Sequence, residues 1–80
     1  MVTVHRAFGY RFVVFPNDHA PPHVHALGQG GEAKVVLGDP DKPVVEWTVG
    51  IPRGDLRRIL DEVRRRHPTL LAAWERVHGR

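Results

Sequence analysis

The stretch VVEWTVGIPRGDLRRILDEV, residues 44–63, contains the point at which the chain changes from one hydrophobic pattern to another. Residues 44–49 are mostly β-branched or aromatic, which is typical of a strand, and Gly50 ends the run. After Pro52 the apolar side chains recur at the i, i+3, i+4, i+7 spacing of one helix face: Leu56, Ile59, Leu60 and Val63. The sequence therefore predicts a strand that leads directly into an amphipathic helix.

Upstream of this junction the chain has the pattern of short strands separated by turns. Strand-like segments occupy 10–15 (YRFVVF), 23–27 (HVHAL) and 32–37 (EAKVVL), and turn-forming Gly, Pro, Asn and Asp residues lie between them. The first segment places three apolar side chains on one face by alternation: Tyr10, Phe12 and Val14. The TVH stretch at 3–5 is expected to add no more than a short edge. These features predict a small antiparallel sheet of three to four strands.

Downstream of the junction a second helix follows the first. The pair His67-Pro68 ends the first helix, because a residue before proline avoids the α region. Pro68 then opens a helix that closes near Gly79, with its apolar face formed by Leu70, Leu71, Trp74 and Val77. No linker divides the chain, so residues 1–80 are expected to form a single α+β domain. In it, two C-terminal helices pack on one face of the sheet.

Composition limits the chemistry and the partners. The chain has no cysteine, which excludes disulfides and thiolate metal sites. No apolar run approaches the 18 or so residues that span a bilayer, so we expect a cytoplasmic protein with no membrane partner. Residues 1–50 carry four basic and five acidic side chains, whereas residues 51–80 carry eight Arg against four acids. The basic C-terminal part favours RNA, DNA or an acidic partner.

The stretch NDHAPPHVH, residues 17–25, concentrates three of the six histidines of the chain. On a strand, His23 and His25 point to the same face about 7 Å apart at their Cα atoms, a workable spacing for two ligands of one ion. The stiff Pro-Pro segment can hold His19 as a third ligand, with Asp18 as a further or supporting one. This pattern predicts a site for a transition metal such as zinc, iron, copper or nickel.

Three other interpretations of the same histidines stay open. Paired imidazoles can act as acid and base, so His19, His23 and His25 are candidate catalytic residues of a metal-independent ribonuclease, given a nearby cation: Arg6, Arg11 or Lys34. A metal-dependent hydrolase would use the same side chains. The histidines could also contact bases or phosphates directly, or serve a rigid corner in which they donate to backbone carbonyls.

The arginines of the first helix have a structural and a functional interpretation. Acids and arginines four residues apart form potential ion pairs along a solvated helix face: Arg57–Asp61, Arg58–Glu62, Asp61–Arg65 and Glu62–Arg66. The alternative is a nucleic-acid-binding or partner-binding module, for which Arg53, Arg64 and Arg65 are the candidate residues. Trp47 joins them because a tryptophan on an edge strand suits an interface.

NDHAPPHVH, the following Gly-containing hairpin, GIPRGDL before a helix and LLAAW in the second helix together resemble a family of small bacterial proteins, domain-of-unknown-function family 4160. The likeness covers residues 3 to 77. Its most specific part is the string His-x-Pro-Pro-His-x-His, formed here by His19, Pro21, Pro22, His23 and His25. The resemblance implies one component of a toxin–antitoxin-like pair, with a small protein partner encoded nearby. A chain this short with an exposed strand edge also has reason to form a homodimer.

Overall fold

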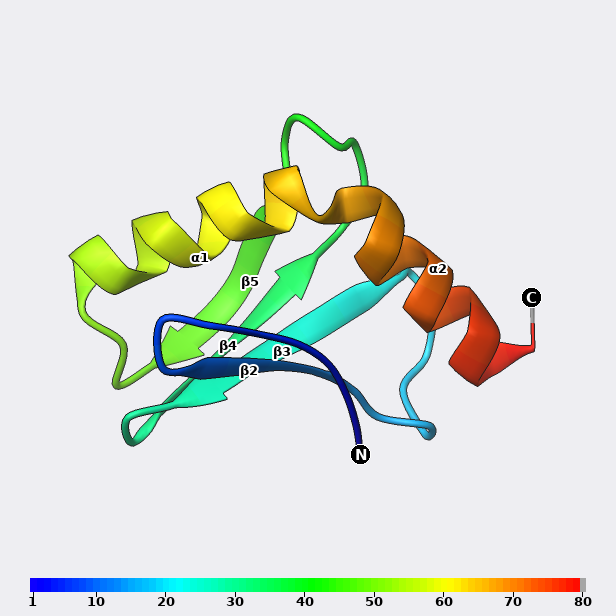
Figure 1. The fold of residues 1–80 in the computed structure, drawn as a ribbon, viewed down its shortest axis with the longest axis horizontal. Helices are drawn as coiled ribbons and strands as arrows, with labels where there is room; N and C mark the ends of the chain where they lie inside the picture. The colour runs from blue at the N-terminus through cyan, green and yellow to red at the C-terminus, as the bar shows by residue number, and fades with distance from the viewer. Residues whose placement is uncertain (80) are drawn as a thin grey trace.

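The computed structural model describes residues 1–79 and contains five strands followed by two helices (Figure 1). The strands are β1 (Val2–Ala7), β2 (Tyr10–Val14), β3 (His23–Gly28), β4 (Gly31–Val36) and β5 (Val44–Val49), and they pair antiparallel in chain order. The α+β class is confirmed, but the expected count of three to four strands was too low. The N-terminal stretch is the expected edge strand, but it is six residues long and has a bulge. The hydrophobic pattern did not indicate the length of this strand, because a polar residue, His5, points toward the core side.

The register places each strand residue on one of two faces of the sheet. Phe12 lies opposite Ala26, and Ala26 lies opposite Ala33, and these buried residues line the core face. The neighbouring positions, in a row across four strands, are Val13, His25, Lys34 and Trp47. Because successive side chains on a strand alternate, this second row belongs to the opposite face. His25 therefore lies on the face turned away from the main core.

Helices α1 (Arg53–Arg65) and α2 (His67–His78) cover one face of the sheet, as predicted (Figure 1). Their buried side chains complete the core with those of the strands, and include Ile59, Val63, Leu70 and Trp74. Gly79, in the left-handed conformation, caps α2. Neither helix within residues 1–79 is long and apolar enough to cross a membrane.

Glu62 of α1 points inward, contrary to the ion-pair pattern predicted for a solvated helix face. Its carboxylate is 2.5 Å from Nε2 of His5 in β1, and Arg65 and Arg66 bind it from the other side. Burial alone would raise the pKa of Glu62, but hydrogen bonds from His5 and Arg66 and the charge of Arg65 outweigh it and lower the pKa. The pairing that the sequence suggested between Glu62 and Arg58 does not form.

Two further pairs of that pattern are also replaced. Asp61 binds Arg64 at the i, i+3 spacing, and not Arg57 or Arg65. Arg58 instead lies with its guanidinium 4.5 Å from the ring centroid of Phe8. Of the four predicted pairs only Glu62–Arg66 is present. The i, i+4 rule missed Arg58–Glu62 because Phe8 and His5 take these side chains, and it missed the two pairs of Asp61 because Arg64 of the same helix binds that carboxylate.

A buried phenol ties the sheet to the start of α1. The hydroxyl of Tyr10 donates to Asp55 at 2.8 Å, and burial, together with this bond, raises the pKa of Tyr10 above its ordinary value of 10.0. We expect Tyr10→Phe to lower the free energy of unfolding by about 1.5 kcal/mol, the lower end for a bond to a charged group. Urea unfolding at neutral pH measures this, with Asp55→Asn, which keeps an acceptor, as the milder control. Equal stability of Tyr10→Phe and wild type would contradict it.

Candidate metal centre

Asp18, His23 and His25 form a compact group at the end of the sheet where β2 connects to β3. One ligand atom from each lies within 4.8 Å of the other two. The carboxylate oxygen Oδ2 of Asp18 is 3.0 Å from Nε2 of His23 and 3.5 Å from Nε2 of His25. The strand supplies both imidazoles and the β2–β3 loop supplies the carboxylate. Two of the three predicted histidines thus meet the predicted acid.

The ring of His23 is fixed by a backbone carbonyl. Its Nδ1 is 2.9 Å from the oxygen of Pro21, and because a carbonyl only accepts, Nδ1 carries the hydrogen. In a neutral ring the lone pair is then on Nε2, the nitrogen that faces Asp18. The ring packs against Trp74 of α2 with centroids 4.9 Å apart and is almost fully buried. His23 is therefore a preoriented candidate ligand on a strand.

The ring of His25 is fixed in the same sense by a carboxylate. Its Nδ1 is 3.0 Å from Glu32 Oε2, so Nδ1 again donates and Nε2 again faces Asp18. A histidine that donates its second nitrogen to a carboxylate is the arrangement that supports metal-bound imidazoles in proteins. Phe15 and Trp47 pack edge-on against the ring and hold its plane. Both imidazoles therefore direct Nε2 toward the same atom, Oδ2 of Asp18.

Two polar atoms at this point have no hydrogen-bond partner. Oδ2 of Asp18 and Nε2 of His23 are buried and unsatisfied, although they are near enough for an ion pair. They are not aligned for a hydrogen bond, and two lone pairs that face each other repel. Leaving a buried polar atom unpaired costs about 1–3 kcal/mol, so such atoms are uncommon in native proteins. A cation placed between the three side chains would satisfy them.

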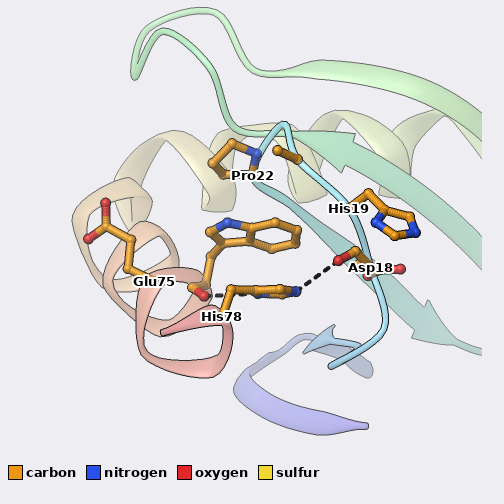
Figure 2. Close-up of a pocket in the computed structure, with 7 residues that line it drawn as sticks. Asp18, His19, Pro22, Glu75 and His78 are labelled. Atoms are coloured by element: carbon orange, nitrogen blue, oxygen red, sulfur yellow. Dashed lines mark hydrogen bonds between the residues drawn. The ribbon is translucent and has the colours of Figure 1, made fainter. Parts of the chain in front are cut away.

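His19 does not join this group. In Figure 2 its ring points away from His78, and it lines a cavity of about 310 Å³ with Asp18, Ala20, Pro22, Trp74, Glu75 and His78. The residue is exposed, unlike the two histidines of β3. Of the four residues predicted for a metal site, the structure brings together Asp18, His23 and His25 and leaves His19 outside. The loop turns it outward because the chain must bend through Pro21 and Pro22 to enter β3.

The C-terminal helix holds the loop that carries Asp18. His78 stacks on Trp74 with ring centroids 3.7 Å apart, and its Nε2 lies 3.1 Å from the backbone oxygen of Asp18 (Figure 2). Its Nδ1 lies 3.0 Å from the carbonyl of Trp74, so the ring lies between two backbone carbonyl oxygens. Sequence reasoning missed His78 and Glu32. Pairing the strands through the β3–β4 hairpin would have found Glu32, but the 60-residue separation from Asp18 to His78 gives no signal.

The acid–base interpretation needs a free cation beside the histidines. Lys34 is directly opposite His25 in the register, as that interpretation requires. Its ammonium, however, is 3.1 Å from Glu46, which neutralises it. Both Nε2 atoms also face a carboxylate, which suits cation binding better than stabilisation of a phosphorane-like anion. Arg6 and Arg11, the other expected cations, line a separate pocket at the other end of β2 and β3. The geometry therefore favours a metal over metal-free catalysis at this point.

The predicted binding residues outside the histidine motif are dispersed. Arg53 begins α1, whereas Arg64 and Arg65 are at its end and are bound to Asp61 and Glu62. Arg64 also donates to the backbone oxygen of Asp41. Trp47 is 40% exposed on the edge strand β5, which also exposes Val44 and Val49. The arginines therefore do not form one patch with the tryptophan.

The comparison with protein families matches residues 9–75, from the turn before β2 to the last turns of α2, with the family described as Domain of unknown function (DUF4160). The chain belongs to the DUF4160 family. The matched region contains the whole Asp18, His23, His25 group together with Glu32. No curated protein and no solved structure matched this DUF4160 chain.

Proposed function

We propose that this DUF4160 protein binds one divalent transition metal ion through Asp18, His23 and His25. The observation that carries the proposal is the orientation of the two rings. Each donates its Nδ1 hydrogen to an acceptor, at Pro21 and Glu32, so both Nε2 lone pairs face one carboxylate. An ion bound in this way would give a partner to the two buried atoms that have none, Oδ2 of Asp18 and Nε2 of His23.

The donor set limits the ion and its chemistry. Two imidazole nitrogens and one carboxylate suit zinc, iron, copper or nickel better than magnesium or calcium, which prefer oxygen ligands alone. Three protein ligands leave coordination positions for water or a substrate, as in catalytic and not structural sites. Asp18 also borders the 310 Å³ cavity, which is large enough for a small molecule. A metal-dependent hydrolase is therefore the enzymatic form of the proposal.

The test is the metal content and affinity of untagged protein. We expect one zinc, iron, copper or nickel ion per chain after incubation and desalting, measured by elemental analysis. Equilibrium competition with a chromogenic chelator then gives the affinity. His19→Ala is the matched control and should bind as tightly as wild type, because its ring lies outside the group. The proposal would be contradicted if none of the four metals bound, or if His19→Ala bound metal more weakly than wild type.

A protein partner, as in a toxin–antitoxin-like pair, remains a separate prediction. Strand β5 supports it, because an edge strand has unpaired backbone groups and this one exposes Val44, Trp47 and Val49. Neither helix covers these three side chains. Co-purification with the product of the neighbouring gene, compared between wild type and Trp47→Lys, distinguishes this from the metal proposal.

A further inference from the structure

A second polar feature lies at the other end of β2 and β3, away from the loop that carries Asp18 (Figure 1). Arg6 of β1 and Arg11 of β2 are direct cross-strand partners on the face that the helices leave open. Like charges placed directly opposite each other destabilise an antiparallel pair. Within residues 1–79, neither guanidinium takes part in an ion pair. The fold therefore holds two uncompensated arginines side by side.

The two arginines border a shallow pocket of about 500 Å³. Its other lining residues are Ala7, Phe8, Gly9, Tyr10, Leu27 and Gly28. The glycine at 28 is needed there, since a Cβ at this position would come within 2.3 Å of the backbone oxygen of Gly9. The acid nearest in the register is Glu32, opposite Leu27, and its carboxylate is bound to His25. The pocket thus combines two guanidinium groups with a small apolar wall and lacks an acid among its lining residues.

Phe8 adds an aromatic ring to this wall. It occupies the β1–β2 turn at φ +38°, a left-handed conformation that Gly and Asn adopt far more readily than an aromatic residue. Arg58 covers one face of the ring, and Tyr10 meets it edge-on. Phe8 lines the pocket together with Arg6 and Arg11. The turn therefore adds apolar surface next to the two cationic side chains.

From this arrangement we infer that the pocket of Arg6, Arg11, Phe8 and Leu27 binds a phosphate-bearing nucleotide, free or within a nucleic-acid chain. The planar guanidinium forks match phosphate oxygens in pairs, and an anion between them relieves their repulsion. The apolar wall of Phe8 and Leu27 would contact the base or sugar. This site is separate from the metal group, since its residues contribute none of the proposed ligands.

The experiment uses ¹⁵N-labelled, metal-free protein in chelator, titrated with inorganic pyrophosphate, adenosine monophosphate and a short single-stranded RNA. Saturable amide shifts should centre on Gly9, Leu27 and Gly28. In the Arg6→Gln, Arg11→Gln variant we expect the affinity for each ligand to fall at least tenfold, while the urea midpoint rises slightly because the repulsion is gone. The control is Arg57→Gln, Arg76→Gln, which removes the same charge from exposed helix positions.

The three ligands separate the sources of the phosphate. RNA that binds at least tenfold more tightly than the mononucleotide at the same amides indicates a nucleic-acid chain, and equal affinities indicate a free nucleotide. An equal loss in the control variant would reduce the effect to net charge and overturn the inference. Shifts centred on α1, or displacement of all three ligands by polyglutamate at equal charge concentration, would do the same. Metal binding by the Arg6, Arg11 variant should be unchanged, so the two proposals fail independently.

Discussion

Asparagine in place of Asp18 is expected to make the metal-free protein more stable and its metal affinity lower. Asn removes the buried anion, and its side-chain amide can donate to Nε2 of His23, which the carboxylate leaves unsatisfied, once the side chain turns to align with that atom. Satisfying this group should raise the free energy of unfolding by about 1–3 kcal/mol. The same change removes an anionic ligand. Structural zinc sites bind with about 10–16 kcal/mol over four ligands, so losing one should weaken binding on the order of 100-fold.

Because Asp18→Asn is expected to raise stability and lower metal affinity, it distinguishes a metal site from a structural ion pair. If Asp18 instead formed a structural ion pair with a charged His23, Asp18→Asn would lose that pair and destabilise the protein, with or without metal. Urea unfolding in chelator gives the first quantity and chelator competition gives the second. Glu32→Gln is the graded comparison, because it keeps an acceptor for His25 Nδ1 but loses the charge, and changes of such supporting groups cost about 10–100-fold in affinity.

Removal of the Glu62 carboxylate should have the largest effect on folding of any single charge in the chain. We expect Glu62→Ala to lower the free energy of unfolding by about 3 kcal/mol, the lower end for breaking a buried ion pair. The lower end applies because His5 keeps 18% of its side chain exposed and can be hydrated once Glu62 is gone. Glu75→Ala, an exposed acid of α2, is the control and should change stability by less than about 0.5 kcal/mol.

The same carboxylate gives stability a defined dependence on pH. The pKa of Glu62 is lower in the folded protein than its ordinary value of 4.5, since bonds from His5 and Arg66 outweigh burial. Its contribution is therefore fully present above pH 4.5 and is lost as the pH falls through the folded-state pKa. Urea midpoints at pH 6 and at successive values below 4.5 should converge for wild type and Glu62→Gln. Parallel curves over that range would contradict this role.

Hydrophobic periodicity was sufficient to predict the α+β class, both helices and four of the strands. It underestimated the length of β1, where the polar residue His5 occupies a core-side position and is paired with Glu62, 57 residues later. Glu62 was misassigned to the surface for the same reason. Hydrophobic periodicity predicts which face of a helix or strand a residue occupies. It does not predict which distant polar residue will pair with it on that face.

The candidate site was predictable where its parts are local. The i, i+2 spacing of His23 and His25 on a strand and the nearby acid were enough to predict that these three side chains lie together, and their role as metal ligands stays a prediction. The position of His19 depends on how the proline segment turns, which no spacing rule describes. The contact of His25 with Glu32 came only with the register of the β3–β4 hairpin. The contact of His23 with the carbonyl of Pro21 is local and is the kind that the rigid-corner interpretation expected.

The contact of His78 with the backbone of Asp18 means that the nine-residue motif NDHAPPHVH is not a portable module. Two of its proposed ligands are fixed by the sheet, but the third sits on a loop that the last turn of α2 secures. Grafted onto another hairpin, the motif would bring the two imidazoles and lose the ring that positions the carboxylate. A design that reuses this geometry must therefore transplant a piece of the helix together with the hairpin, as one discontinuous unit.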